Sequence, residues 1–215
     1  MKSPDHREIK QALQDWIPED RLTFRPGWKT RGRPWSNGIR GMMVHHWAGT
    51  GDGGQQWMEQ VGTSDYPYCN STVRRGTGSS VDGEVMVISA YSAWHSGLGG
   101  PWGKAGVPKD AAHLMVWGTE MEGPLPSTRY GKDDMTDLQW DSVYRLGCAL
   151  REVAGPEAFP NFQRVVKHSD WTDGTSGVAV YSLPTLGRKN DVWADTKFIR
   201  SGCKKTWASR ADKAS

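Results

Sequence analysis

Apolar residues near the start of the chain recur at helical spacing. Ile9, Leu13, Trp16 and Ile17 lie on one side of a helical projection, and the pattern stops at Pro18. Proline lacks a backbone donor and interrupts a helix. The pattern therefore predicts a short amphipathic helix over residues 7–17.

Five short apolar runs further along the chain predict β-strands. Each run is bounded by Gly, Pro or polar residues, as is typical of strands. The first, Met42 to Val44, follows an irregular Gly- and Pro-rich stretch at 25–38. The others are STVRR at 71–75, EVMVIS at 84–89, LMVWGTEMEG at 114–123 and RVVKH at 164–168.

Helical patterns separate several of these strands. Residues 55–61 predict a short helix, and Thr136 with Gln139 forms a capping-box pattern that opens a longer one. Gly155 and Pro156 end that helix. Strands and helices that alternate in this way predict the α/β class, with a central mixed sheet of five or six strands flanked by helices and ligands bound at strand ends and loops.

Length and composition favour a single domain, with a lead-in before it and a tail after it. The chain has 215 residues, 36% of them hydrophobic, which is enough for a single core. We expect residues 1–40 to form a helix and an irregular lead-in that pack on the domain, and 41–203 to form the domain itself. Residues 204–215 are mostly polar or small, so a flexible tail is expected there.

The charge of the chain argues against nucleic-acid binding. Its net charge is +3 with a sequence pI near 8.7, which suits an anionic cell-wall surface but is too small to indicate DNA or RNA. No helix-turn-helix or zinc-finger pattern accompanies the basic residues.

The cysteines and the apolar segments indicate in which cellular compartment the chain folds and whether it enters a membrane. The three cysteines form no C-x-x-C pair, so neither a disulfide framework nor a thiolate metal site is indicated, and a reducing compartment is expected. The start, MKSPDHREIK, lacks the apolar core of a signal peptide, and no segment reaches membrane-spanning length. We therefore expect no membrane insertion.

Candidate metal ligands follow two of the predicted strands. His45 and His46 come directly after Met42–Val44, and His168 ends the run at 164–168. A polar cluster at 187–191 supplies a carboxylate, Asp191. Two histidines and a carboxylate can hold a catalytic zinc ion and leave a fourth position for water.

Glu120 also follows an apolar run, in the segment GTEMEG. From the residues alone it is either a surface glutamate beside the end of a strand or a carboxylate that faces a site. The choice stays open at this level.

Several motifs together resemble one family over about 42–200. The chain resembles the zinc-dependent N-acetylmuramoyl-L-alanine amidases of type 2, which include phage amidases and peptidoglycan recognition proteins. The motifs, in the order of that family, are VHHWAG at 44–49, AWHSG at 93–97, GTEMEG at 118–123, KHSDW at 167–171 and GRKND at 187–191.

The resemblance implies a role for each matching residue. His45, His168 and Asp191 would bind Zn²⁺, and Glu120 and Lys189 would be the catalytic pair. The range 41–203 would then be the catalytic domain. An exchange of roles between His45 and His46 stays open.

Four further residues are implied to contact substrate. His95 resembles a substrate-contacting histidine of the family, and Trp94 beside it is expected to stack on a sugar or shield the cleft. His46 would pack beside the metal or contact substrate. Tyr68 falls near a tyrosine that is catalytic in some relatives, and its part in catalysis stays open.

The chain departs from the family pattern in two places. Residues 172–186 form an added Gly- and Ser-containing loop between His168 and the last ligand, so Asp170 and Asp173 remain fallback ligands. The usual Asp-Pro is Asp191-Val192 here, which affects a turn more than a ligand.

The resemblance implies a monomeric peptidoglycan hydrolase that cuts the amide between the lactyl group of N-acetylmuramic acid and L-alanine. A phage endolysin is expected, held in the host cytoplasm until a holin-type opening releases it to the wall. The alternatives are a non-catalytic peptidoglycan-binding module and a zinc peptidase that cuts within the stem peptide.

Overall fold

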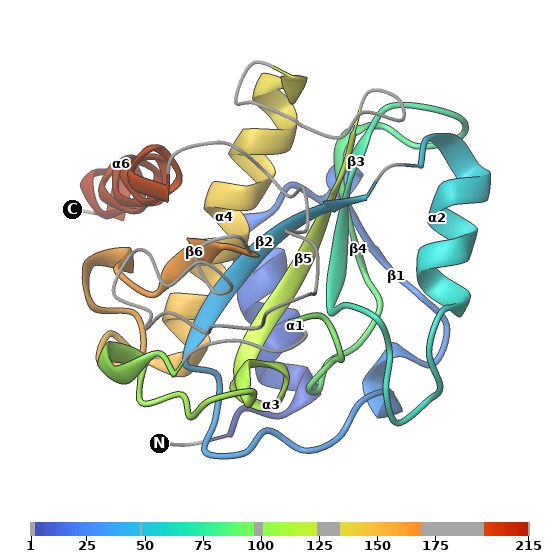
Figure 1. Ribbon diagram of the computed structural model, residues 1–215. Coiled ribbons are helices and arrows are strands. Elements are labelled where there is room, and N and C mark those ends of the chain that lie inside the picture. The colour runs from blue at the N-terminus through green and yellow to red at the C-terminus, as the bar shows by residue number, and fades with distance from the viewer. Residues whose placement is uncertain (1–2, 48, 97–100, 124–133, 169–195, 215) are drawn as a thin grey trace.

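Six strands form one sheet with helices against both faces (Figure 1). The computed structural model describes residues 3–47, 49–96, 101–123, 134–168 and 196–214. The strands are β1 (Leu22–Phe24), β2 (Gly41–Trp47), β3 (Ser71–Arg75), β4 (Asp82–Val87), β5 (Val116–Glu122) and β6 (Val165–Lys167). The helices are α1 (His6–Trp16), α2 (Gly51–Gln60), α3 (Ala112–Met115), α4 (Asp137–Ala154) and α6 (Thr196–Ala214), with 3-10 turns η1 (Glu19–Arg21), η2 (Trp28–Thr30), η3 (Gly103–Ala105) and η5 (Pro160–Phe162).

The strand order across the sheet is β1-β4-β3-β5-β2-β6. β3 and β4 pair antiparallel, and the other neighbouring strands pair parallel. The predicted α/β domain with a mixed sheet of five or six strands is confirmed, with six. Because β5, β2 and β6 are parallel neighbours, their carboxyl ends meet at one edge of the sheet.

The two faces of the sheet differ in chemistry. Met42 and Val44 of β2 point to the face covered by α1, α4 and α6, where they join the largest apolar cluster. The residues between them point the other way, because side chains alternate along a strand. That second face carries α2 and α3, and it holds buried polar side chains among the apolar ones.

The predicted helix ends agree with the structure where a capping box exists. Thr136 and Gln139 exchange side-chain and backbone hydrogen bonds at 3.0 Å, and α4 runs from Asp137 to Ala154 as the pattern predicted. Asp5 and Glu8 form a second capping box, which starts α1 at His6. A cap of this kind contributes about 0.5–2 kcal/mol.

Several elements differ from their predictions, and β4, for example, begins at Asp82 and ends at Val87 where residues 84–89 were predicted. α2 begins at Gly51, four residues before the predicted start at Gln55. β1 was not predicted, because its three residues are part-buried and lie at the edge of the sheet beside β4. β2 continues to Trp47, so His45 and His46 lie within the strand and not after it.

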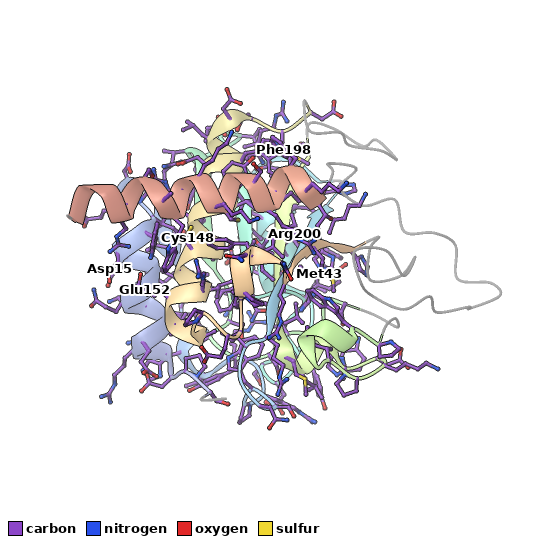
Figure 2. The ribbon with its side chains drawn as sticks, turned by 90° about the vertical axis from the view of Figure 1, so that its left-hand side faces the viewer. Asp15, Met43, Cys148, Glu152, Phe198 and Arg200 are labelled. Carbon is purple, nitrogen blue, oxygen red and sulfur yellow. The ribbon has the colours of Figure 1, made fainter. Side chains whose placement is uncertain are left out.

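The expected tail over 204–215 is corrected for 204–214, which continue α6. The helix packs because Ile199 and Cys203 are fully buried against the core. Trp207 stacks on Trp16 with ring centroids 5.2 Å apart, and the Arg151 guanidinium lies over the Trp207 ring. Figure 2 views the molecule from this side, with α6 lying over α4 near Cys148. Among the described helices, none has the length and apolar character needed to cross a bilayer.

Candidate active site

His45, Glu120 and His168 come from three adjacent strands at one edge of the sheet. In the parallel pairing of β2 with β5, His45 lies opposite Glu120. On the other side of β2, Lys167 of β6 pairs with Val44, so His168 reaches the level of His45. Residues opposite each other in neighbouring strands point to the same face. The sheet therefore brings together three site residues that are 48 to 123 positions apart in sequence.

The three side chains are close and almost fully enclosed. Nδ1 of His45 lies 4.0 Å from Oε1 of Glu120, and the rings of His45 and His168 have centroids 4.4 Å apart. Each of the three residues is only 2–3% exposed. Polar side chains are buried at a cost unless they have partners or a function, which marks this cluster as a candidate site.

His95 lies inside the same cluster. Its Nδ1 is 3.0 Å from Nε2 of His45, and its Nε2 is 2.7 Å from the carbonyl oxygen of Val116. The residue is 3% exposed. Both ring nitrogens thus meet protein groups, an arrangement that favours a supporting role over the substrate contact that the resemblance implied.

The backbone of β5 leaves room for the ring of His95 at Gly118. A Cβ added to Gly118 of β5 would overlap the imidazole, so only glycine leaves room for it there. Asn70 holds Gly118 in place, since its Oδ1 accepts from the Gly118 N–H at 2.9 Å. Sequence reasoning identified neither Gly118 nor Ser96, although AWHSG and GTEMEG were both recognised as motifs.

His46 points away from this cluster. It follows His45 in a regular strand, so its side chain projects to the face covered by α4 and α6. An exchange of roles with His45 would require the strand to turn over, because the register with β5 is continuous from Gly41 to Trp47. The geometry favours His45 as the ligand, and it does not bring His46 to the predicted substrate side.

Trp94 and Tyr68 lie at the surface near the cluster. Trp94, directly before His95, is 52% exposed and has its ring 4.4 Å from that of His113. Tyr68 is part-buried and meets Trp57 edge-on at 5.7 Å. The positions of both are compatible with a substrate-binding surface, and their roles stay predictions.

Lys189 and Asp191 lie outside the described residues, as do Asp170 and Asp173. Within the described part of the chain, no three His, Cys, Asp or Glu side chains form a metal-binding group. The chemistry of His45 and His168 nevertheless fits zinc, which prefers imidazole nitrogen, and the two rings are adjacent. If the protein binds zinc, these two residues would provide two of the three ligands that a catalytic site needs.

A buried thiol lies beside the cluster. Burial raises the pKa of Cys69, and the neighbouring Glu120 carboxylate raises it further. The thiol therefore stays protonated at neutral pH, and a neutral thiol is a poor metal ligand and nucleophile. Cys69, Cys148 and Cys203 are all buried free cysteines.

A second carboxylate on β5 is held in a different way. Glu122 is fully buried and accepts hydrogen bonds from Nε of Arg74 at 3.0 Å, the Arg75 N–H at 2.9 Å and the Gly51 N–H at 2.6 Å. The hydroxyl of Thr77 donates to it as well. Glu122 thus joins β5 to β3 and to the start of α2.

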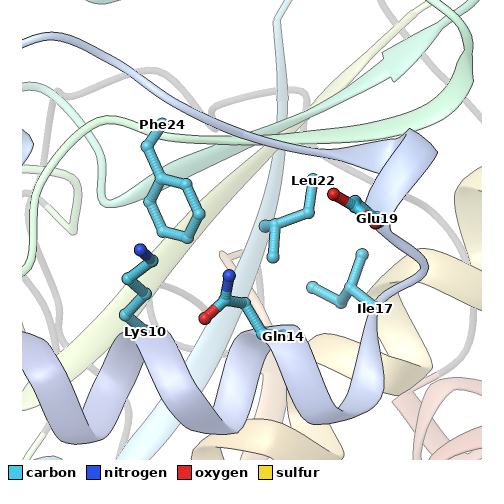
Figure 3. A pocket seen from close by; sticks show the side chains of 6 residues that line it. All are labelled: Lys10, Gln14, Ile17, Glu19, Leu22 and Phe24. Atoms are coloured by element: carbon cyan, nitrogen blue, oxygen red, sulfur yellow. The ribbon is translucent and has the colours of Figure 1, made fainter.

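A pocket elsewhere on the molecule is unrelated to this cluster. It lies between α1 and β1 at the far edge of the sheet (Figure 3). Its lining mixes apolar and charged side chains from Lys10, Gln14, Ile17, Glu19, Leu22 and Phe24. Two strands, β4 and β3, separate β1 from β5, so the pocket lies apart from His45 and Glu120.

The chain is similar in fold to solved structures of other proteins. AmpDh3 from Pseudomonas aeruginosa, solved in complex with anhydromuramic pentapeptide, matches 78% of this chain with a TM-score of 0.50 and 16% identity. This chain covers 60% of the length of that structure. The endolysin LysCS from Clostridium intestinale, an N-acetylmuramoyl-L-alanine amidase, matches 86% of this chain and 95% of its own, with a TM-score of 0.45 and 16% identity. No protein-family model and no curated protein sequence matches the chain. At this identity, the likeness to AmpDh3 is one of fold.

Proposed function

We propose that this protein is a zinc-dependent N-acetylmuramoyl-L-alanine amidase. The observation that carries the proposal is the enclosed cluster of His45, Glu120 and His168 at the carboxyl edge of β5, β2 and β6. A fold of this kind holds an anhydromuramic pentapeptide in AmpDh3, which supports a muropeptide as the ligand class.

His45 and His168 would hold the metal, with Asp191 as the third ligand implied by the sequence resemblance. A bound zinc ion supplies a Lewis acid and lowers the pKa of a coordinated water to about 7. The donor set supports this choice, since two adjacent imidazoles suit zinc better than they suit Mg²⁺ or Ca²⁺.

Glu120 would act as the general base and then as the general acid. Its carboxylate lies beside His45, so a water activated next to that ring is within reach of Oε1. Glu120 would take a proton from the attacking water and return it to the amine of L-alanine as the amide bond breaks. Lys189, as the resemblance implies, would stabilise the negative charge that develops on the carbonyl oxygen.

A digest of purified peptidoglycan tests the proposal. The protein is stripped of metal with a chelator, reloaded with zinc, and scored for new alanine amino termini and new sugar reducing ends. Alanine termini that require zinc support the amidase. New reducing ends would indicate a glycosidase, termini within the stem peptide would indicate a peptidase, and tight pelleting without cleavage would indicate a binding module. Each of these three results contradicts the proposal.

The biological role that we propose, host lysis by a phage from the cytoplasmic side, rests on the sequence resemblance alone. Expression in the bacterial cytoplasm with and without a co-expressed holin tests it. Lysis that requires the holin supports the role, and lysis without it contradicts the proposed release step.

A further inference from the structure

An arginine and three aromatic rings form a continuous row beside the enclosed cluster. The guanidinium of Arg33 lies over the Tyr66 ring, 4.1 Å from its centre. Tyr66 meets Trp94 edge-on with ring centroids 5.7 Å apart, and Trp94 in turn lies 4.4 Å from His113. Because Trp94 directly precedes His95, the row begins next to the cluster and leads away from it to Arg33.

Backbone hydrogen bonds hold the segments that carry this row. The carbonyl oxygen of Arg33 accepts from the N–H and from the hydroxyl of Ser92, each at 3.0 Å. The Trp94 N–H donates to the carbonyl oxygen of Pro67, the residue after Tyr66, at 2.7 Å. The main chain therefore fixes the positions of the guanidinium and of both rings relative to one another.

The charge of Arg33 has no counterpart in the described part of the chain. Arg33 is exposed, and it belongs to none of the ion pairs among the described residues. Asp65, directly before Tyr66, accepts a hydrogen bond from the Ser64 hydroxyl instead. Burial lowers the pKa of His113, so that ring is neutral at neutral pH. Arg33 is therefore the permanent cation of the row.

A guanidinium stacked on a ring is suited to bind a carboxylate. Its N–H groups lie in one plane, and two of them match the two oxygens of a carboxylate. The stacking also restricts the side chain in advance, so less conformational entropy is lost when an anion binds.

We propose that Arg33 and Tyr66 form a subsite for a carboxylate of the bound muropeptide, with Trp94 between this subsite and the enclosed cluster. The inference rests on the proposed function, because it takes a muropeptide as the ligand. The family resemblance covers about 42–200, so it assigns no role to Arg33.

A muropeptide can present such a carboxylate in two places. The stem peptide carries free carboxylates, and a lactyl group becomes a carboxylate once its stem has been removed. Both groups are planar anions that accept two hydrogen bonds, so Arg33 suits either of them. The ligands of the test distinguish the two sources.

The test compares one soluble muropeptide in two forms, with its stem carboxylates free or converted to amides. Binding is measured by calorimetry on the Glu120→Gln protein, which prevents turnover. The free form should bind about three- to tenfold more tightly than the amide form, as expected for a charge-assisted contact at an exposed site. Arg33→Met should abolish this difference and leave the affinity for the amide form within about twofold.

Lys205→Met is the matched control for Arg33→Met. Lys205 is exposed on α6, so the substitution removes the same charge on the other face of the sheet and should preserve the difference between the two forms. A second variant, Tyr66→Leu, keeps the charge of Arg33 and removes the ring beneath it, so the difference should shrink without vanishing. Melting temperatures are measured for each variant.

Glycan strands stripped of their stems provide the ligand for the second source. If the subsite takes the lactyl carboxylate, the strands bind more weakly to Arg33→Met than to Lys205→Met, and the two muropeptide forms bind alike. If it takes a stem carboxylate, only the two muropeptide forms are distinguished. Affinities that are equal in Arg33→Met and Lys205→Met for every ligand would overturn the inference.

The outcomes separate this inference from the proposed function. Carboxylate binding that depends on Arg33, in a protein that releases no alanine amino termini with zinc, would overturn the amidase and leave the subsite. Cleavage that requires zinc, with no effect of Arg33→Met on the binding of any ligand, would leave the amidase and overturn the subsite.

Discussion

Two buried glutamates on β5 lie two residues apart and are held in opposite ways. Glu122 is surrounded by fixed donors, among them the Arg74 guanidinium and two backbone N–H groups. Glu120 faces imidazoles, with Nδ1 of His45 4.0 Å away. The same type of side chain on the same face of one strand thus joins three elements at Glu122 and lies beside a histidine at Glu120, where we propose that it transfers protons.

The partners of each glutamate explain the difference. A guanidinium and backbone amides cannot give up their protons at neutral pH, so the carboxylate of Glu122 is a permanent acceptor. Imidazoles exchange protons and bind metals in that range. The comparison therefore predicts that the loss of the Glu120 carboxylate lowers turnover and that the loss of the Glu122 carboxylate lowers stability.

The largest expected effect is on turnover. Glu120→Gln keeps the shape of the side chain and removes its basicity, so kcat should fall by about 10²- to 10⁴-fold. Zinc content and the unfolding midpoint should stay near those of the wild type, because glutamine keeps the size and shape of the side chain. Release of alanine amino termini, metal analysis and thermal unfolding are measured on one preparation. Turnover within a few fold of wild type would remove Glu120 from the mechanism.

The matched change two residues away should affect stability instead. Glu122→Gln leaves the buried Arg74 charge without its main partner, which typically costs about 3–5 kcal/mol in the free energy of unfolding. Activity per folded molecule should change little. Urea unfolding measures the loss.

A second substitution checks the cause of that loss. Adding Arg74→Met to Glu122→Gln removes a charge whose remaining ionic partner is the exposed Asp52, and should recover part of the stability, since buried ion pairs are often replaced by apolar groups without loss. A double variant that is no more stable than Glu122→Gln would show that the ion pair is not the source.

The sequence predicted most of the strands and the longest central helix, but it did not predict which strands lie next to each other in the sheet. Apolar runs located five of the six strands, and the capping box at Thr136 gave the start of α4. The adjacency of His45, Glu120 and His168 depends on the strand order β5-β2-β6, which no periodicity reveals. The family resemblance supplied that grouping for residues the local pattern could not join.

Two differences have local physical reasons. The role of His95 depends on a hydrogen bond to a residue 50 positions away, and a motif match cannot show which group a ring nitrogen meets. The helix over 204–214 was missed because its composition is polar, although Ile199, Cys203 and Trp207 recur every four residues and form its buried stripe. Periodicity was the better guide there than composition.

A smaller effect is expected from a substitution that crowds the ring of His95. Gly118→Ala adds a methyl group where the His95 ring lies, so the ring must move and zinc affinity should fall by about 10-fold. The overlap should also cost about 1–3 kcal/mol of stability. Gly53→Ala is the control, because a methyl group there meets open space in α2. Unchanged zinc affinity in a folded Gly118→Ala protein would mean that the ring position does not matter.

The smallest expected effect lies at the surface beside the cluster. Trp94 is half exposed and stands directly before His95, so its ring is available for stacking on a sugar face. An aromatic stacking contact contributes about 0.5–1.5 kcal/mol beyond the area it buries, so Trp94→Ala should weaken binding of muropeptides by about two- to tenfold. The melting temperature should change little, since the side chain is largely outside the core.

Leu138→Ala provides the matched control for Trp94→Ala. Leu138 is 46% exposed and lies on α4, which covers the opposite face of the sheet. Affinity for a soluble muropeptide, measured by calorimetry with the Glu120→Gln protein to prevent turnover, should fall for Trp94→Ala and not for Leu138→Ala. An equal loss in both variants would reflect general surface hydrophobicity. A loss of melting temperature in Trp94→Ala alone would mean that Trp94 supports the fold near His113, and the substrate surface would then have to be sought elsewhere around the cluster.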